Sequence, residues 1–260
     1  MEKIELNYNA AMVDIVVVGV GGTGSNLVPY LMQLANTCEK VKTITLIDGD
    51  VFEEKNKRNQ KCLDIDLGKS KSEVLASRYS RVYPSLNIRF WDKYIYSSDD
   101  VKSLFTNNRY LYHREKYLPI LISCVDNNAT RQLLHKFFYN ENIESLMYID
   151  SGNGTIEMNG QIVIGFKKDN KVILPPVADV FPEILEDNDE VESEVGCAAT
   201  IEEHPQNIAT NVMAATVLFS VVNKLLSFNI IAEHMLLFDA FNNNVVSRPI
   251  SKSMLVKKDL

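Results

Sequence analysis

A glycine-rich turn directly after an apolar run constrains the fold of this chain more than any other feature of its sequence. Residues 15–18 are a β-branched run of the kind found in buried parallel strands. Four glycines follow at once: Gly19, Gly21, Gly22 and Gly24. Glycine permits a tight turn and lets backbone N–H groups approach a phosphate closely. We therefore predict a strand, an anion-binding turn, and then a helix over residues 25–36 whose N-terminus faces the same anion.

The next apolar run extends this pattern to a nucleotide site. Residues 44–47 have the pattern of a second strand, and this strand ends in Asp48. A carboxylate at this position can accept hydrogen bonds from ribose hydroxyls. The alternative for Asp48 is a turn aspartate without a ligand. A glycine turn between strand and helix, with an acid ending the following strand, predicts a nucleotide but does not say which one.

The rest of the chain predicts an α/β fold. Strand patterns alternate with helical patterns, the strands at residues 87–91, 120–126 and 146–150 and the helices at 69–82 and 127–140. This order is typical of a Rossmann-like, doubly wound sheet that binds ligands at the carboxyl ends of parallel strands. After residue 150 the patterns change to antiparallel strands, at 160–166 and in a closing hairpin around 236–247. We expect a mixed sheet, mostly parallel in its N-terminal half.

The chain shows no internal repeat and no linker, so we predict one domain over residues 1–260. Its nucleotide-binding half spans 13–150, and its C-terminal half spans 151–260 with a crossover loop at about 175–206. The acidic run at 183–194 is either a solvated mobile segment or a contact for a basic partner. Polar residues interrupt the long apolar pattern at 207–226, which favours a buried or dimer-facing helix over a membrane span.

Charge and cysteine usage narrow the functional classes. The net charge is −7 and no basic stripe is visible, which argues against a general nucleic-acid binder. The first residues lack the basic and apolar regions of a signal peptide. Four cysteines lie far apart and form no Cys-x-x-Cys pair: Cys38, Cys62, Cys124 and Cys197. We therefore expect no structural zinc and a reducing, cytoplasmic location.

Taken together, the motifs resemble the E1-like adenylyltransferases of the ThiF/MoeB class, bacterial relatives of the ubiquitin-activating enzymes. The matching pieces occur in the family's order over roughly residues 13–250: the glycine turn, Asp48-Gly-Asp-Val51, Asn56 with Arg58 and Gln60, Asp66-Leu-Gly-Lys-Ser-Lys71, and Cys124-Val-Asp-Asn-Asn-Ala-Thr-Arg131. Within this class the chain looks most similar to the stand-alone ThiF-like proteins of PRTRC systems.

The resemblance implies a reaction that depends on ATP and Mg²⁺. The C-terminal carboxylate of a small ubiquitin-like or sulfur-carrier protein would be activated as an acyl-adenylate, in an enzyme expected to be a homodimer. ATP would lie over the glycine turn, with its ribose at Asp48. Lys71 would clamp the α- and β-phosphates, Arg58 would hold the γ-phosphate, and Asp126 would hold Mg²⁺.

Further residues of the motifs are expected around the same site. Asn56 and Gln60 can hydrogen-bond phosphate or metal-bound water without adding charge, and Asp50 is a second candidate for the metal region. Asn127 is expected at the cofactor site and, with Arg131, in fixing the loop and pairing with carboxylates. Two structural alternatives stay open: Lys71 as a surface lysine, and Asp126 as the cap of the following helix.

Cys197 is a further candidate because of its place in the chain. It follows the acidic run, in the region where several E1-like proteins keep a cysteine that takes the activated acyl group as a thioester. A thiol on a flexible segment can reach an adenylate. However, no Arg or Lys lies within ten residues, the preceding carboxylates would raise the pKa of the thiol, and His204 is the nearest helper. A cysteine without a catalytic role is the alternative.

One departure from the family pattern keeps other functions open. The family spaces its Asn and Arg by three, whereas Arg58 follows Asn56 by two and Asn59 stands before Gln60. Either the loop is one residue shorter or Arg58 is not the γ-phosphate ligand. The chain could then be a non-catalytic module that binds a nucleotide or a partner. An NAD-dependent oxidoreductase shares the glycine turn but has no need of Lys71 or Asp126.

Overall fold

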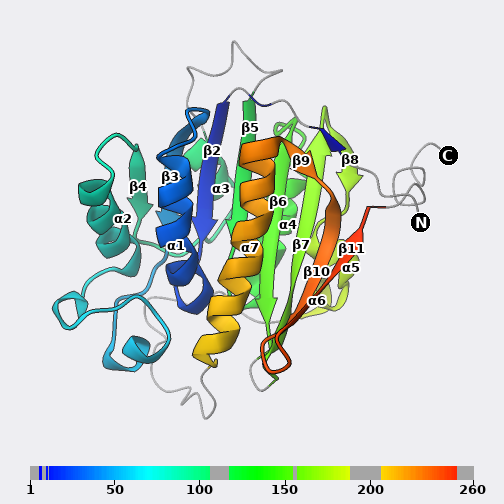
Figure 1. Ribbon diagram of the computed structural model, residues 1–260. Coiled ribbons are helices and arrows are strands. Elements are labelled where there is room, and N and C mark those ends of the chain that lie inside the picture. The colour runs from blue at the N-terminus through cyan, green and yellow to red at the C-terminus, as the bar shows by residue number, and fades with distance from the viewer. Residues whose placement is uncertain are drawn as a thin grey trace.

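One mixed sheet with helices on both faces forms the body of the molecule (Figure 1). The computed structural model describes residues 6–7, 10, 12–105, 117–154, 157–187 and 206–250. The parallel half of the sheet contains β2 (Met12–Val18), β3 (Val41–Ile47), β4 (Ile88–Trp91), β5 (Tyr117–Ser123) and β6 (Leu146–Asn153). β2 lies at its centre and pairs in parallel with β3 and β5. The predicted Rossmann-like core is confirmed.

The C-terminal half adds antiparallel strands to the edge beside β6. They are β7 (Asn159–Lys168), β8 (Lys171–Leu174), β10 (Glu233–Asp239) and β11 (Asn244–Pro249). Within the described residues the order is β11-β10-β7-β6-β5-β2-β3-β4, with β8 pairing β7. A separate two-stranded sheet joins β1 (Leu6–Asn7) to β9 (Ile230–Ile231). The predicted change from parallel to antiparallel pairing after residue 150 is therefore correct.

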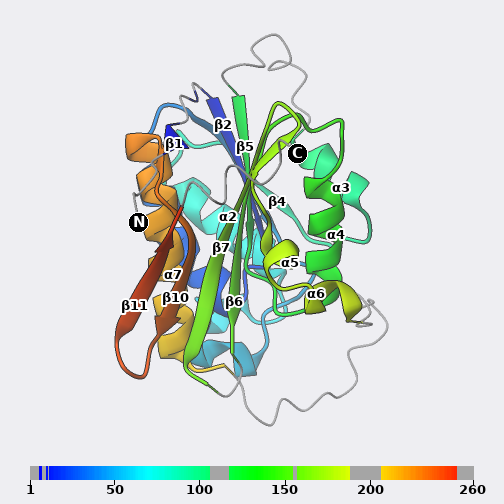
Figure 2. The ribbon, with the colours of Figure 1, turned by 90° about the vertical axis from the view of Figure 1, so that its right-hand side faces the viewer.

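Two layers of helices cover the sheet (Figure 2). One face carries α1 (Gly22–Ala35), α2 (Lys71–Val82) and α7 (Ile208–Phe228), and the other carries α3 (Ser98–Phe105), α4 (Asn128–Phe138), α5 (Val177–Val180) and α6 (Glu183–Glu186). Successive side chains of a strand point to opposite faces. Ile15 and Val17 of β2 therefore enter the first core, and Val16 enters the second. Burial on both faces explains why residues 15–18 of β2 are an unbroken apolar run.

α7 is the longest described helix and belongs to the first core. By length and composition it is apolar enough to cross a membrane, a test that the core helix of a soluble protein also passes. Its side chains Ala214, Leu218 and Val222 are fully buried against the sheet and α1. The predicted buried helix is thus confirmed.

Some boundaries differ from those expected from sequence. α1 begins at Gly22 rather than at residue 25, because the end of the glycine turn is already helical and Ser25 N donates to Gly21 O at 2.9 Å. β5 ends at Ser123, so Asp126 lies in the following loop and does not end a strand. Short elements without a periodic signal were not predicted: β8, α5, α6 and two 3-10 turns at Glu54–Arg58 and Asp64–Asp66.

Candidate nucleotide site

The glycine turn lies where the carboxyl end of β2 meets the N-terminus of α1. Gly19 has φ +82°, and a Cβ on it would lie 2.9 Å from the carbonyl oxygen of Cys124. A Cβ on Gly24 would lie 2.0 Å from the carbonyl oxygen of Gly19. Both positions therefore require glycine, one for its backbone angle and the other for close approach. The first N–H groups of a helix have no intrahelical acceptor, so the start of α1 beside this turn is suited to an anion.

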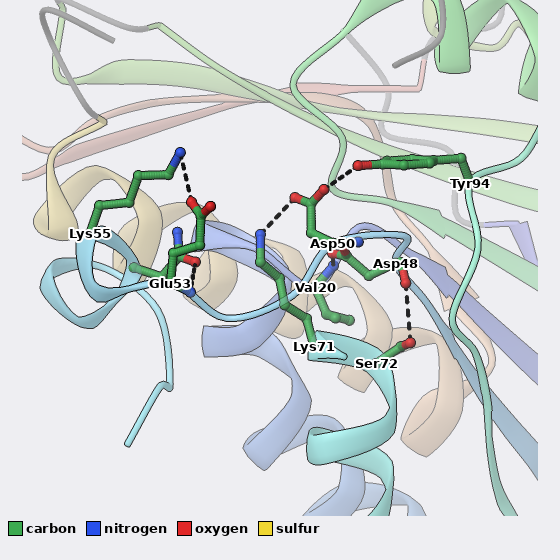
Figure 3. Close-up of polar contacts among 9 residues, drawn as sticks. Val20, Asp48, Asp50, Glu53, Lys55, Lys71, Ser72 and Tyr94 are labelled. Atoms are coloured by element: carbon green, nitrogen blue, oxygen red, sulfur yellow. Dashed lines mark hydrogen bonds and ion pairs between the residues drawn. The ribbon is translucent and has the colours of Figure 1, made fainter. Parts of the chain in front are cut away.

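Asp48 connects the end of β3 to this turn (Figure 3). Its Oδ2 accepts a hydrogen bond from Val20 N at 2.8 Å, and its Oδ1 accepts one from Asp50 N at 2.9 Å. Burial raises the pKa of Asp48 to about 6, with Lys71 opposing the shift and Asp50 adding to it. Each carboxylate oxygen keeps acceptor capacity beyond these bonds. Asp48 both shapes the turn and retains the capacity to accept ribose hydroxyls.

Lys71 lies beside Asp48, at the start of α2. Its Nζ donates to Asp50 Oδ2 at 2.7 Å, and Tyr94 Oη donates to Asp50 Oδ1. Burial alone would lower the pKa of Lys71, but Asp48 and Asp50 outweigh burial and raise it. The ammonium is therefore charged at neutral pH. The lysine side chain is 7% exposed, so it is not the surface lysine of the alternative interpretation.

Neutral amides surround the other side of the glycine turn. Asn211 is fully buried in α7 and lies so close to Gly22 that a Cβ there would be 2.7 Å from its amide. Its Nδ2 also lies 3.4 Å from Thr23 Oγ1, and Asn153 Nδ2 donates to the same hydroxyl at 2.8 Å. Gln60 Nε2 lies 3.8 Å from the position of a Cβ on Gly21. Gln60 therefore lies at the turn, as predicted.

The loop before Gln60 places its side chains differently from what the family motif implies. Asn59 points inward, and its Nδ2 donates to Asn211 Oδ1 at 3.3 Å. Arg58 is exposed and has no side-chain hydrogen bond or ion pair with a described residue. Asn56 is buried, and its Oδ1 accepts from Glu53 N at 2.9 Å, which caps the 3-10 turn. The side chains of Asn59 and Gln60, rather than Arg58, thus face the turn.

The loop after β5 brings Asp126 to the same edge of the sheet. Its carboxylate raises the pKa of both Lys71 and Arg131, so it lies within electrostatic range of each. Asp126 is exposed and has no hydrogen-bond or ion-pair partner among the described residues. Asn127, not Asp126, caps α4, because its Oδ1 accepts from Thr130 N at 2.8 Å. The capping interpretation of Asp126 is therefore wrong.

Arg131 braces this loop from behind. Its Nε lies 3.3 Å from both carboxylate oxygens of Asp150, and its Nη2 donates to the carbonyl oxygen of Val125 at 2.6 Å. Arg131 thus pairs with a carboxylate and fixes the loop, as expected from sequence. Burial raises the pKa of the Cys124 thiol, which leaves it protonated at neutral pH.

The structure brings most of the predicted site together at one edge of the sheet: Gly19, Gly21, Gly22, Gly24, Asp48, Asp50, Gln60, Lys71 and Asp126. Cys197 and His204 lie outside the described residues. Sequence reasoning missed Tyr94 and Asn153, which had no motif signal. It also missed Asn211, although a polar residue inside an apolar helix was a signal that could have been used.

Metal binding at this edge would depend on few protein ligands. Within the described ranges there is no group of three or more His, Cys, Asp or Glu side chains suited to a metal ion. Mg²⁺, however, is usually held by one or two carboxylates together with substrate phosphates and water. The unpaired carboxylate of Asp126 fits that donor set.

Comparisons with known proteins place the chain among relatives of known fold. The model of the ThiF family matches residues 7–256. No curated protein matches the sequence. A crystal structure of SeMet PaaA is similar with a TM-score of 0.62 and 14% identity, over 92% of this chain and 64% of that one. E. coli MccB with ATP is similar with a TM-score of 0.55 and 17% identity, over 92% and 63%.

A third structure, E. coli MccB with AMPCPP and SeMet MccA, has a TM-score of 0.57 and 16% identity, over 92% of this chain and 64% of that one. This chain therefore spans a little under two thirds of the length of these proteins. At such identities the likeness establishes the shared fold, a mixed sheet with a Rossmann-like parallel half.

Proposed function

This chain belongs to the ThiF family, and on that premise we propose that it is an ATP-dependent, E1-like adenylyltransferase. The observation that carries the proposal is the convergence of opposite charges at one glycine turn. The Lys71 ammonium hydrogen-bonds the carboxylate of Asp50, with Asp48 and Asp126 in electrostatic range. A buried cation beside a backbone anion site suits a triphosphate, because fixed positive charge stabilises the oxygens on which charge develops.

In the proposed reaction a carboxylate oxygen of the substrate attacks the α-phosphorus of ATP. The bond from that phosphorus to the bridging oxygen breaks, and pyrophosphate leaves with the bonding electrons. The products are an acyl-adenylate and pyrophosphate, so no oxidant or further reactant is needed. The α1 N-terminus and glycine turn would bind the phosphates, Asp48 the ribose, and Lys71 the α- and β-phosphates.

The remaining residues have more limited roles in this proposal. Asp126 would hold Mg²⁺, which when bound supplies positive charge to the phosphate oxygens. Gln60 would hydrogen-bond a phosphate or a metal-bound water, and its buried Oε1 has no partner among the described residues. Asn56 and Asn127 would act through the loops that they cap, and Asp50 through Lys71. Arg58 would reach the γ-phosphate only after a change of side-chain position.

We further propose that the substrate is the C-terminal carboxylate of a small ubiquitin-like or sulfur-carrier protein. A solved MccB structure contains MccA together with AMPCPP, which supports a small polypeptide substrate for a protein of this fold. A homodimer, a cytoplasmic location, thioester formation on Cys197 and a PRTRC context belong to the same proposal. Membrane and nucleic-acid partners are not part of it.

A non-catalytic nucleotide- or partner-binding module is the second candidate. The exposed position of Arg58 favours it, because the irregular loop then presents no cation to the γ-phosphate. Asn59 and Gln60 offer only neutral amides in its place. Such a module would bind ATP without forming an acyl-adenylate.

ATP–pyrophosphate exchange with purified candidate carrier proteins distinguishes the two. The enzyme predicts Mg²⁺-dependent exchange that Lys71→Ala and Asp126→Ala each abolish. Lys69→Ala is the matched control, because Lys69 is exposed on the same loop and should leave exchange unchanged. ATP binding without exchange in the presence of the genuine carrier would support the module. Absence of ATP binding would contradict the enzyme and leave only the partner-binding form of the module.

A further inference from the structure

The segments that carry Asp50 and Lys71 are tied together by their backbones. Lys71 N donates to Asp50 O at 3.0 Å, Phe52 N to Lys69 O at 2.9 Å, and Gly68 N to Phe52 O at 2.8 Å. Gly68 makes the turn possible with φ +74°. The backbone hydrogen bonds therefore fix the relative position of Asp50 and Lys71 independently of the contact between their side chains.

A third segment, directly after β4, holds the carboxylate of Asp50. Tyr94 Oη donates to Asp50 Oδ1, while Asp50 Oδ2 accepts from Lys71 Nζ at 2.7 Å (Figure 3). The Tyr94 ring lies against Gly49, where an added Cβ would be 2.7 Å from the ring atoms. Gly49 thus allows the tyrosine to approach the carboxylate, and the three side chains form one chain of hydrogen bonds.

This chain of bonds orders a side chain that is otherwise flexible. A free lysine loses rotamer entropy when it is fixed. Here the loss occurs before a ligand arrives, because the ammonium is already held by Asp50 and enclosed with 7% of its side chain exposed. An ammonium has three donors. One hydrogen-bonds Asp50, which leaves two for phosphate oxygens.

We propose that Asp50, held by Tyr94, is a positioning residue that fixes the Lys71 ammonium for the phosphates of a nucleotide bound over the glycine turn. This inference rests on the proposed function, in which Lys71 contacts those phosphates. The Asp50 carboxylate also repels the phosphates. It therefore orders the Lys71 ammonium but lowers the affinity of the site for bound nucleotide. Lower ground-state affinity is favourable where the ammonium is needed most in the transition state.

Three carboxylates act on the Lys71 ammonium, those of Asp48, Asp50 and Asp126, against the effect of burial. Removal of the Asp50 charge leaves the amine with less compensation for burial, so the pKa of Lys71 falls. A larger fraction of Lys71 is then neutral and reactive at pH 8. The shift shows that the carboxylate of Asp50 acts on the ammonium of Lys71, and nucleotide binding, measured separately, tests whether this serves the site.

The test measures acetylation of Lys71 by acetic anhydride from pH 7 to 11, followed by peptide mass spectrometry. We expect Asp50→Asn to raise the labelling rate at pH 8 at least tenfold and to move its pH profile to lower pH. Tyr94→Phe, which removes only the hydroxyl, should raise it about threefold. Lys69, exposed on the same loop, is the internal control. Asp92→Asn and Tyr96→Phe, both at exposed residues nearby, are the matched controls.

Nucleotide binding supplies the second readout. Trp91, the single tryptophan of the chain, ends β4, and its carbonyl oxygen accepts from Asp48 N at 3.1 Å, so its fluorescence serves as the probe of binding. We expect Asp50→Asn to bind ATP as tightly as wild type or up to several-fold more tightly. Equal labelling in wild type and Asp50→Asn would overturn the inference, as would weaker ATP binding accompanied by a lower Tm. Failure of ATP to bind or to protect wild-type Lys71 would instead overturn the proposed function.

Discussion

Two cation–carboxylate pairs lie at the same edge of the sheet and differ in what they leave available to a ligand. In the pair Arg131–Asp150 the side chains are 11% and 1% exposed, with a separation of 3.3 Å. In the pair Lys71–Asp50 they are 7% and 36% exposed, with a separation of 2.7 Å. The first pair is enclosed on both sides, whereas the second has one side toward solvent.

The hydrogen bonds of the two cations show the same contrast. Arg131 uses Nε on Asp150, Nη1 on Asn128 and Nη2 on Val125 O, so each nitrogen of its guanidinium is engaged within the protein. Among the described residues Lys71 Nζ has one such bond, to Asp50. A buried ion pair therefore braces a loop when all donors of its cation are used within the protein, and it can bind a ligand when some donors remain available.

We expect the largest effect from a substitution that breaks the enclosed pair, Arg131–Asp150. Arg131→Met leaves Asp150 buried without its cation, and we expect the free energy of unfolding to fall by about 3–5 kcal/mol. Urea denaturation measures the loss. The double variant Arg131→Met/Asp150→Leu should recover most of it, because no uncompensated charge remains. A loss below about 1 kcal/mol in the single variant would show that the pair is not a brace.

Substitution in the pair Lys71–Asp50 should change ATP binding more than it changes the free energy of unfolding. Lys71→Ala removes the cation expected at the phosphates and leaves Asp48 and Asp50 to repel them. We expect the Kd for ATP to rise up to about 100-fold, because a hydrogen bond to a charged group contributes about 1.5–3 kcal/mol. Isothermal titration calorimetry measures the Kd, with Lys69→Ala as the control. An unchanged Kd would mean that Lys71 does not touch the nucleotide.

A third buried cation, Lys167, differs from both, because no carboxylate of the described residues compensates its charge. Lys167 is 3% exposed, its Nζ donates to Asn140 O at 2.9 Å, and burial lowers its pKa to about 8. A folded-state pKa below the unfolded value makes the charged form unfavourable in the folded protein, so stability rises as pH increases from about 8 to 10.5.

We therefore expect Lys167→Met to stabilise the protein at pH 7 by about 1–2 kcal/mol, since the lost hydrogen bond offsets part of the gain. The gain should largely disappear by about pH 10.5, where the wild-type lysine is neutral in the folded state and about half neutral in the unfolded state. Urea denaturation at pH 7 and at pH 10.5 gives the two values. Destabilisation at pH 7 would contradict the expected cost of the buried charge.

The smallest expected effect concerns Asp48, a carboxylate near a cation but not directly paired with one. Its pKa of about 6 means that it is ionised at pH 7.5 and largely protonated at pH 5. We expect ATP affinity to fall about tenfold over this range, because protonation removes the charge that makes Asp48 a strong acceptor for the ribose hydroxyls. Asp48→Asn should flatten the part of the pH dependence that is not due to ATP itself. Identical pH profiles of ATP affinity in wild type and Asp48→Asn would exclude Asp48 from binding.

Local features of the site could be predicted from sequence, and features that join distant segments could not. The strand, the glycines and Asp48 lie close in the chain, and their spacing alone implies their geometry. Asp126 was placed at the correct edge but on a strand that in fact ends at Ser123. The inward side chain of Asn59 and the exposed one of Arg58 depend on α7, which lies about 150 residues later in the chain.

The order of the main strands and helices, the glycine turn and the change to antiparallel pairing follow from the sequence. Each depends on short-range periodicity or on the conformational freedom of glycine. The tertiary structure alone decided that Tyr94 holds Asp50, that Asn211 packs against Gly22, and that Arg131 and Lys71 have different partners. These contacts join segments far apart in the chain. Their geometry depends on how the helices pack on the sheet, which no local pattern specifies.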